Sequence, residues 1–295
     1  MEVRQLGSRT ALRVSAIGFG GAPIGLQNYL TDEDRDSPAF RSQAIDAVRL
    51  AVDLGINFFD TAPGYGTGRS ESIFGEALSR VRERVCLATK YPFGEGWNPD
   101  AATAGLHASL ARLRTDHVDL LQLHGGIFTD AQAESILASG VPAWADSMRE
   151  AGLCRFTGIT AEGPSGALER LLRTERFDVI EIQYNLLYQA VCDHQRAPAG
   201  IAVLAKSLGM GVTAMRPATS GLFQRIMRST FPELDSGALT RLALNFVLST
   251  PEIDCAVVGM RSTAEVSENA ALASDTATRL DLRALHERYV TGSRQ

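Results

Sequence analysis

The sequence predicts an α/β fold, a (β/α)8 or TIM barrel in which an N-terminal β-hairpin closes the bottom. Three features of the 295-residue chain support this prediction. Short apolar runs alternate with longer segments of helical periodicity, and each strand–helix pair takes roughly 25–45 residues. Eight such pairs follow one another, the number that closes a parallel sheet into a barrel. Polar residues also stand at the carboxyl ends of several apolar runs, where the functional loops of a barrel gather.

The strands are predicted from apolar runs that end at polar or turn-forming residues. Residues 3–14 form the hairpin, with its turn at Gly7 and Ser8, and the barrel strands follow. They span 15–20, 56–60, 85–90, 118–124, 154–160, 177–184, 211–215 and 255–258.

The helices are predicted from apolar residues spaced three or four apart. The first follows a polar insertion at 31–42 and ends at Gly55, and the second opens with Ser70 and Glu71. The predicted helices span 43–54, 70–81, 100–114, 141–151, 165–173, 201–208, 238–249 and 263–273, with a C-terminal helix at 281–289.

We expect a single domain over residues 1–295, with 281–295 as a C-terminal helix and tail, because no Pro-, Gly- or Ser-rich linker divides the chain. A doubly wound sheet is the competing architecture. Its G-x-G-x-x-G fingerprint fails here, since Pro23 stands where the third glycine belongs. The glycines after Tyr65 lack the G-K-[ST] of a phosphate-binding loop.

Composition indicates an ordinary globular protein, with 45% hydrophobic and 21% charged residues. The formal net charge of −5 argues against a general nucleic-acid binder. No apolar run approaches the roughly 20 residues that span a bilayer, and the N-terminus lacks a secretory pattern, so we expect a cytoplasmic location. The four cysteines form no metal-type cluster, which predicts buried thiols and no metal site.

Four residues at the ends of successive strands are the candidate catalytic groups. Asp60 ends an apolar strand and Tyr65 follows in the next turn, while Lys90 and His124 end the next two strands. Lys90 is notable because it is one of only two lysines among 29 basic residues. A closed barrel would bring all four side chains to one point.

The chemistry of these side chains favours protonation of a carbonyl oxygen. Tyr65 is a weak acid with an ordinary pKa near 10, and an ammonium nearby favours its ionised form. Lys90 at about 4 Å would contribute about 4 kcal/mol, which predicts a lowered pKa for Tyr65. Asp60 would hold Lys90 in its charged form, and His124 would orient and polarise the carbonyl.

At these residues the chain resembles the aldo-keto reductases over essentially its whole length. Tyr65 lies in the segment Asp60-Thr61-Ala62-Pro63-Gly64-Tyr65-Gly66, and Lys90 and His124 occupy the other two positions of the family's catalytic tetrad. The resemblance implies reduction of an aldehyde or ketone by hydride transfer from NAD(P)H, with Tyr65 as general acid.

The resemblance also implies a set of cofactor contacts. They are Gly21, Ala22, Thr160, Gln183, Met215, Arg216, Pro217, Gly221, Gly259, Arg261, Ser262, Glu265, Glu268 and Asn269. Arg261 is placed to receive a 2′-phosphate, which favours NADP(H) over NAD(H), whereas a carboxylate at Glu265 would repel that phosphate. Ala161 lacks the side-chain amide that many members have there, and Met215 replaces an aromatic residue.

Other functions remain open. The same site run in reverse would make an NAD(P)+-dependent aldose or alcohol dehydrogenase. A Schiff-base aldolase on Lys90 and a non-catalytic NADPH-binding regulatory subunit are further alternatives. Phe93 and Trp97 are expected to wall the substrate pocket together with Tyr65 and His124. The sequence names neither the carbonyl substrate nor the oligomeric state.

Overall fold

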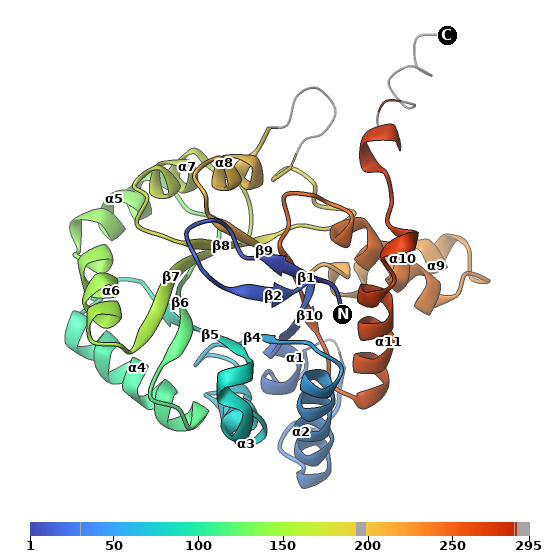
Figure 1. The fold of residues 1–295 in the computed structure, drawn as a ribbon, viewed down its shortest axis with the longest axis horizontal. Coiled ribbons are helices and arrows are strands. Elements are labelled where there is room, and N and C mark those ends of the chain that lie inside the picture. Colours follow the sequence, from blue (N-terminus) through green and yellow to red (C-terminus); the bar gives the residue numbers. More distant parts are fainter. Residues whose placement is uncertain (30, 193–198, 286, 288–295) are drawn as a thin grey trace.

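The computed structural model describes residues 1–29, 31–192, 199–285 and 287. Eight parallel strands close into a barrel in the order β10-β3-β4-β5-β6-β7-β8-β9, with helices around the outside (Figure 1). A separate antiparallel hairpin, β1–β2, pairs Val3 with Ser15 and lies across one end of the barrel. The predicted (β/α)8 fold and its N-terminal hairpin are therefore confirmed.

The strands agree closely with the predicted runs. They are β1 (Val3–Gln5), β2 (Arg13–Ser15), β3 (Ile17–Gly20), β4 (Phe58–Asp60), β5 (Cys86–Pro92), β6 (Val118–His124), β7 (Cys154–Ala161), β8 (Val179–Gln183), β9 (Gly211–Met215) and β10 (Cys255–Gly259).

In the described part of the chain, the helices comprise the eight predicted between residues 43 and 273 and three further ones. They are α1 (Ala22–Gly25), α2 (Pro38–Asp53), α3 (Arg69–Leu78), α4 (Pro99–Leu113), α5 (Asp130–Ala138), α6 (Val141–Glu150), α7 (Gly166–Arg173), α8 (Ile201–Ser207), α9 (Leu222–Thr230), α10 (Ser236–Leu248) and α11 (Thr263–Ser274). Short 3-10 segments span Ser79–Arg84, Thr219–Gly221 and Thr276–Thr278. The predicted helix at 281–289 runs into residues 286 and 288–295, which lie outside the described part of the chain.

Three helices lie where loops were predicted: α1, α5 and α9. In α5 the Thr129 hydroxyl accepts from the Gln132 amide, and the Gln132 side chain accepts from the Thr129 amide, which forms a capping box. Helix α2 also begins earlier than predicted, because Ser37 caps it and Pro38 occupies its first turn. In α2 and α5 a local capping signal therefore sets the start of the helix, whereas α1 and α9 begin after glycines without a side-chain cap.

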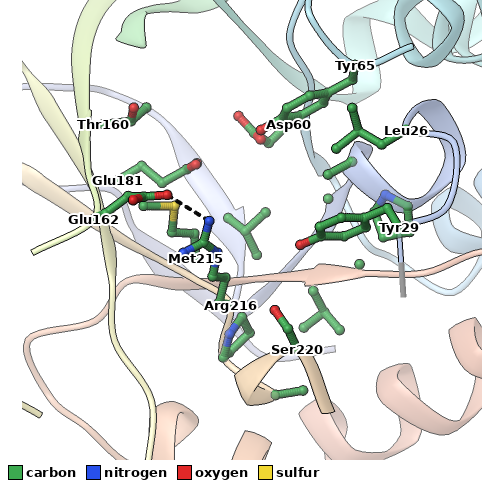
Figure 2. A pocket seen from close by; sticks show the side chains of 18 of the residues that line it. Leu26, Tyr29, Asp60, Tyr65, Thr160, Glu162, Glu181, Met215, Arg216 and Ser220 are labelled. Atoms are coloured by element: carbon green, nitrogen blue, oxygen red, sulfur yellow. Dashed lines mark hydrogen bonds and ion pairs between the residues drawn. The ribbon is translucent and has the colours of Figure 1, made fainter. Parts of the chain in front are cut away.

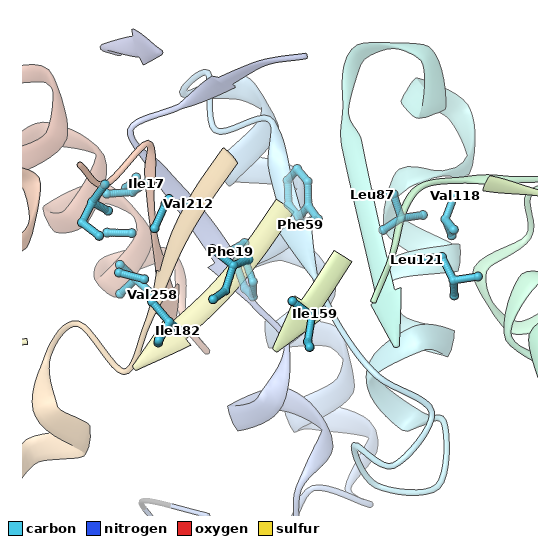
Figure 3. Close-up of a cluster of buried hydrophobic side chains, with 14 of the residues drawn as sticks. Ile17, Phe19, Phe59, Leu87, Val118, Leu121, Ile159, Ile182, Val212 and Val258 are labelled. Atoms are coloured by element: carbon cyan, nitrogen blue, oxygen red, sulfur yellow. The ribbon is translucent and has the colours of Figure 1, made fainter. Parts of the chain in front are cut away.

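The core has an outer and an inner part, because successive strand residues point to opposite faces. Phe19, Phe59 and Ile182 face the helices and belong to the larger buried cluster (Figure 3). A smaller cluster lies inside the barrel, where Leu6 and Val14 from the hairpin segment pack among strand residues. The hairpin end is thus filled by apolar side chains, which leaves the carboxyl ends of the strands for chemistry.

All four cysteines are buried, as the sequence predicted. Within the residues that the structure describes, no helix has both the length and the apolar character needed to cross a bilayer.

Candidate active site

Because strand side chains alternate between the two faces, a group of polar side chains points into the barrel. They lie above the smaller apolar cluster around Leu6 and Val14, which plugs the hairpin end of the barrel. Asp60, Lys90, Gln122 and Glu181 come from β4, β5, β6 and β8, and each is at most 3% exposed. Lys90 stands opposite Gln122 across the β5–β6 pair, so the two side chains enter the interior at the same level. The result is a buried polar layer near the mouth of the barrel.

Asp60 and Lys90 form the centre of this layer. The Lys90 Nζ donates to both carboxylate oxygens of Asp60, at 2.6 and 2.5 Å, and to the Thr61 carbonyl at 3.1 Å. The Gln122 amide donates to Asp60 Oδ1 at 3.0 Å. On the other side, Glu181 Oε1 lies 3.7 Å from Lys90 Nζ. The predicted Asp60–Lys90 pair is present, with Glu181 as a second carboxylate that the sequence reasoning missed.

This arrangement moves the protonation equilibria of both partners. Burial, reinforced by the negative charge of Glu181, raises the pKa of Asp60 above its ordinary value. Burial alone would lower the pKa of Lys90, but the two carboxylates outweigh it and hold that pKa above the ordinary value. Lys90 is therefore a fixed ammonium, which is the form that the sequence analysis required.

Tyr65 lies in the tight turn that follows β4. Gly66 adopts φ +68°, a conformation that favours glycine, and a Cβ there would lie 2.0 Å from the Gly25 carbonyl oxygen. This close approach fixes the turn against α1 and directs the Tyr65 ring into the mouth. The ring centroid is 5.3 Å from Lys90 Nζ and 6.0 Å from the His124 ring. The four predicted catalytic residues thus meet at one place.

The predicted lowering of the Tyr65 pKa is wrong in this structure. Lys90 does lower it, as expected, but burial raises it by more, and the charges of Asp60 and Glu181 raise it further. The net result is a pKa of about 12 for Tyr65. The prediction weighed the ammonium before any offset from burial, and it left out the charges of the two carboxylates.

His124 ends β6 and is accessible at the mouth of the barrel. Partial burial of its ring, helped by the positive charge of Lys90, lowers the pKa of His124 to about 4. The imidazole is therefore neutral near pH 7, with one nitrogen able to donate a hydrogen bond.

A cavity of about 270 Å³ opens above these residues (Figure 2). It is lined by Asp60, Tyr65, Lys90 and His124 together with the predicted cofactor residues Ala22, Thr160, Met215, Arg216, Pro217, Gly221 and Gly259. Leu26, Tyr29, Glu162, Glu181 and Ser220 also line it and were not predicted. The cavity joins the catalytic group to the loop after β9, where the dinucleotide was expected.

Seven predicted cofactor residues lie outside the lining of this cavity: Gly21, Gln183 and the five residues that follow β10, which are described below. The Gly21 amide donates to the Asp60 carbonyl at 2.8 Å, and a Cβ at Gly21 would lie 2.2 Å from Ser70 Oγ, so this glycine serves close packing. Gln183 instead accepts from Arg216 Nη1 at 2.8 Å. Glu181, two residues earlier on the same face of β8, lines the cavity in its place.

Thr160 lines the cavity, but its hydroxyl is already engaged. Thr160 Oγ1 accepts from the Gly125 amide at 2.9 Å and donates to the Gly125 carbonyl at 3.3 Å. Arg216, by contrast, reaches across the mouth and pairs with Glu162 at 2.7 Å (Figure 2). The side chains of Arg216 and Glu162 remain partly accessible, so this bridge can rearrange around a ligand.

Phe93 and Trp97 are not brought to this cavity. They line a second one, of about 540 Å³, between the loop after β5 and helix α4. Their ring centroids are 6.1 Å apart, and Trp97 packs in turn on Trp144. In the structure these residues belong to an aromatic cluster behind β5 rather than to the wall around Tyr65.

The predicted adenosine-binding residues lie together after β10, away from the catalytic cavity. Ser262 caps α11 by accepting from the Glu265 amide at 3.3 Å. Glu268 is exposed and Asn269 half-buried on the same helix. The Arg261 guanidinium forms ion pairs with Glu265 and with Glu33, the latter at 3.5 Å.

Comparison with known proteins places this chain in a family. A family model described as "Aldo/keto reductase family" matches residues 16–236. The L-galactose dehydrogenase of Arabidopsis thaliana is 30% identical over 298 residues, which cover 93% of this chain and 89% of the relative.

Two solved structures have the same fold. The holo form of aldo-keto reductase AKR11C1 from Bacillus halodurans superposes with a TM-score of 0.74 at 25% identity, covering 98% of this chain and 96% of that one. An aldo/keto reductase from Klebsiella pneumoniae in complex with NADP and acetate has a TM-score of 0.72 at 22% identity, covering 98% and 95%. With the family model and the plant relative, these findings show that the chain is an NAD(P)-dependent oxidoreductase and belongs to the aldo/keto reductase family.

Proposed function

We propose that this enzyme reduces a small aldehyde or ketone to an alcohol, with Tyr65 as the general acid and the bound dinucleotide as the hydride source. One observation carries the proposal. Tyr65, the Lys90–Asp60 pair and His124 line a single cavity, with the Tyr65 ring 5.3 Å from the Lys90 ammonium and 6.0 Å from the imidazole.

The protonation states of these groups suit reduction near neutral pH. With a pKa of about 12, Tyr65 holds its proton, and a developing alkoxide oxygen is basic enough to take it. The fixed ammonium of Lys90 stabilises the tyrosinate left behind. Neutral His124 donates a hydrogen bond that orients the carbonyl oxygen beside the phenol.

The buried state of Lys90 disfavours the Schiff-base alternative. An amine must be free of its proton to attack a carbonyl. Lys90 is bound to both oxygens of Asp60 and its pKa is raised, so its nitrogen lone pair is not free for attack.

The residues at the mouth fit a nicotinamide dinucleotide. We propose that Met215 covers the nicotinamide ring and that Arg216 contacts the pyrophosphate, near the uncapped N-terminus of α9 at Gly221. Glu181 Oε2 is buried, has no hydrogen-bond partner among the described residues and belongs to a residue that lines the cavity, so it offers an acceptor to a carboxamide. The NADP-bound Klebsiella structure supports such a cofactor, and Arg261 was the basis for expecting NADP(H).

Oxidation of a hydroxyl group is the second candidate, and the name of the plant relative, an L-galactose dehydrogenase, favours it. This direction needs Tyr65 as a base, in its ionised form. Because the pKa of Tyr65 is raised to about 12, oxidation should become faster as the pH rises through 8–10. Reduction should stay nearly constant over the same range, so the two directions can be separated by initial rates.

The test combines dinucleotide binding with turnover. Wild type, Tyr65→Phe and Tyr188→Phe are titrated with NADH and NADPH by fluorescence, and then assayed with a panel of aldehydes. Tyr65→Phe should bind dinucleotide normally and lose about 10²–10⁴ in kcat, the usual contribution of a general acid. The exposed Tyr188 serves as the control. A Tyr65→Phe enzyme that keeps wild-type kcat would overturn the assigned role.

A further inference from the structure

The contacts of Arg261 bear on which dinucleotide the enzyme selects. Arg261 lies between β10 and α11, where the adenosine end of a dinucleotide was expected. Its backbone amide donates to Glu265 Oε2 at 2.6 Å, and its Nη2 donates to the other oxygen of the same carboxylate. Glu265 therefore binds both the main chain and the guanidinium of the residue that would hold a 2′-phosphate.

Glu265 also neutralises the start of helix α11. It is the third residue of that helix, in the first turn after the Ser262 cap. The exposed amides of a helix N-terminus carry a partial positive charge that attracts phosphate groups. The Glu265 carboxylate lies in this turn and offsets the partial positive charge of the helix N-terminus. The attraction that the helix start exerts on an incoming phosphate is therefore weakened.

Glu33 supplies a second carboxylate from the loop before α2. Its Oε2 lies 3.5 Å from Arg261 Nη1 and also accepts from Arg35 Nη1 at 3.0 Å. The Arg35 side chain is fully buried, so it cannot turn outward to meet a phosphate. Arg261 therefore faces two carboxylates, while the other cation of this cluster is held inside the protein.

We infer that Glu265 and Glu33 together make this enzyme select NAD(H) over NADP(H). A phosphate monoester carries a charge of about −1.5 to −2 near pH 7. To bind Arg261 it would have to displace Glu265 or lie beside its carboxylate, and like charges repel in either case. The 2′- and 3′-hydroxyls of an unphosphorylated ribose can instead donate to the carboxylate as it stands, which is how acidic residues recognise NAD in other folds.

This inference rests on the proposed function and deepens it, and it reverses the preference predicted from Arg261 alone. The sequence presents Arg261 as an available cation, but Arg261 directly precedes the Ser262 cap and its side chain pairs with Glu265 in the first turn of the helix. The pairing with Glu33 joins residues 228 positions apart and follows only from the fold.

Equilibrium binding of NAD+ and NADP+ to the whole enzyme, measured by isothermal titration calorimetry, tests the inference without turnover. Wild type should bind NAD+ at least about tenfold more tightly, a difference of about 1.4 kcal/mol. Glu265→Gln and Glu33→Gln should each bring the two dissociation constants closer together, mainly by lowering the Kd for NADP+. The matched control is Asp32→Asn, which removes a carboxylate from the same loop that has no described contact with Arg261.

The outcomes separate this inference from the function beneath it. A wild type that binds NADP+ as tightly as NAD+, or more tightly, would overturn the selection while leaving the oxidoreductase proposal intact. Failure to bind either dinucleotide would overturn both. Should Asp32→Asn shift the ratio as much as Glu33→Gln, general charge and not the contact to Arg261 would be responsible. If Glu265→Gln does not fold, the wild-type ratio and Glu33→Gln still decide the question.

Discussion

At the scale of single residues, Glu181 changes the electrostatics of the barrel interior. One ammonium, Lys90, is shared by two buried carboxylates, Asp60 and Glu181. Other titratable groups around Glu181 are Tyr65 at the mouth and the thiol of Cys255 on β10, whose pKa burial raises. On the flanking strands the residues paired with Glu181 are Thr160 and Thr213, which carry neutral hydroxyls. An unbalanced negative charge therefore remains close to the phenol.

We predict that Glu181→Gln moves the pH dependence of oxidation to lower pH. Glu181 raises the pKa of Tyr65, so removing its charge makes the tyrosinate easier to form. The alkaline rise in kcat/KM for oxidation should begin at lower pH, and the alkaline decline of reduction should do the same. Thr213→Val is the control, because it alters the same interior layer without a change of charge. Superimposable pH profiles for Glu181→Gln and wild type would contradict the prediction.

His124 gives a second pH prediction, this time for stability. Its pKa of about 4 in the folded protein lies below the ordinary value of about 6.5. Between these values the unfolded chain binds more protons than the folded one, so this histidine makes stability fall as the pH drops from about 6.5 toward 4.

His124→Asn should therefore lose less stability than wild type between pH 7 and pH 4.5, as measured by urea denaturation. His107→Asn, at an exposed histidine on α4, is the control and should follow wild type. An equal loss in His124→Asn and wild type would show that this residue does not titrate as proposed.

Among the elements, the catalytic strands were the most predictable part of the chain. Asp60, Lys90 and His124 each end an apolar run, and the period of two fixes which residues face the barrel interior. The same rule could have identified Glu181, since it stands in the apolar run of β8 with Gln183 on the same face. The resemblance drew attention to Gln183 because that residue directly precedes Tyr184 and Asn185.

The helices α5 and α9 could not be predicted from composition. The first turn of α5 is set by a capping box at Thr129, a signal that spans only four residues. Helix α9 follows Ser220 and Gly221, both at positive φ, within a loop that serves the cavity. The position of Phe93 and Trp97 behind β5 depends on their contact with each other and on the packing of Trp97 on Trp144, which is distant in sequence.

Contact between helices gives a prediction at the element scale. Helices α3 and α4 approach closely at Gly75, where a Cβ would lie 2.2 Å from the Arg112 carbonyl oxygen. Gly75→Ala should push these helices apart and lower the free energy of unfolding by about 1–3 kcal/mol, as overpacking does.

Gly105 provides a control in which the same substitution should change stability in the opposite direction. It lies on the exposed face of α4, and no atom of the residues that the structure describes would lie within 4 Å of a Cβ there. Gly105→Ala should stabilise the protein by about 0.5–1 kcal/mol through helix propensity. Urea denaturation of both variants tests the pair, and a destabilised Gly105→Ala together with a neutral Gly75→Ala would contradict the packing argument.

For the molecule as a whole, the two ends of the barrel divide stability from chemistry. The hairpin segment fills the bottom with Leu6, Leu12 and Val14, while the Asp60–Lys90 layer lies toward the mouth. Arg4 ties the hairpin to the far end of the chain through the carbonyl groups of Leu248 and Ile253, at 2.7 and 2.8 Å. The bottom is thus closed by contacts between segments almost the whole chain apart.

We predict that Leu6→Ala destabilises the protein strongly and leaves the pH profile of catalysis unchanged. Leu6 is fully buried, and truncating a core leucine costs about 2–5 kcal/mol through lost burial and the cavity that remains. The apolar residues Phe58 and Ala88 lie between this plug and the Asp60–Lys90 layer, so the charges that set the pKa of Tyr65 stay in place. Val3→Ala, at an exposed position of the same hairpin, should cost little. A shift of the pH profile in Leu6→Ala, like the one expected for Glu181→Gln, would contradict this prediction. It would mean that water reaches the Asp60–Lys90 layer from the hairpin end, so that the two ends of the barrel are not independent.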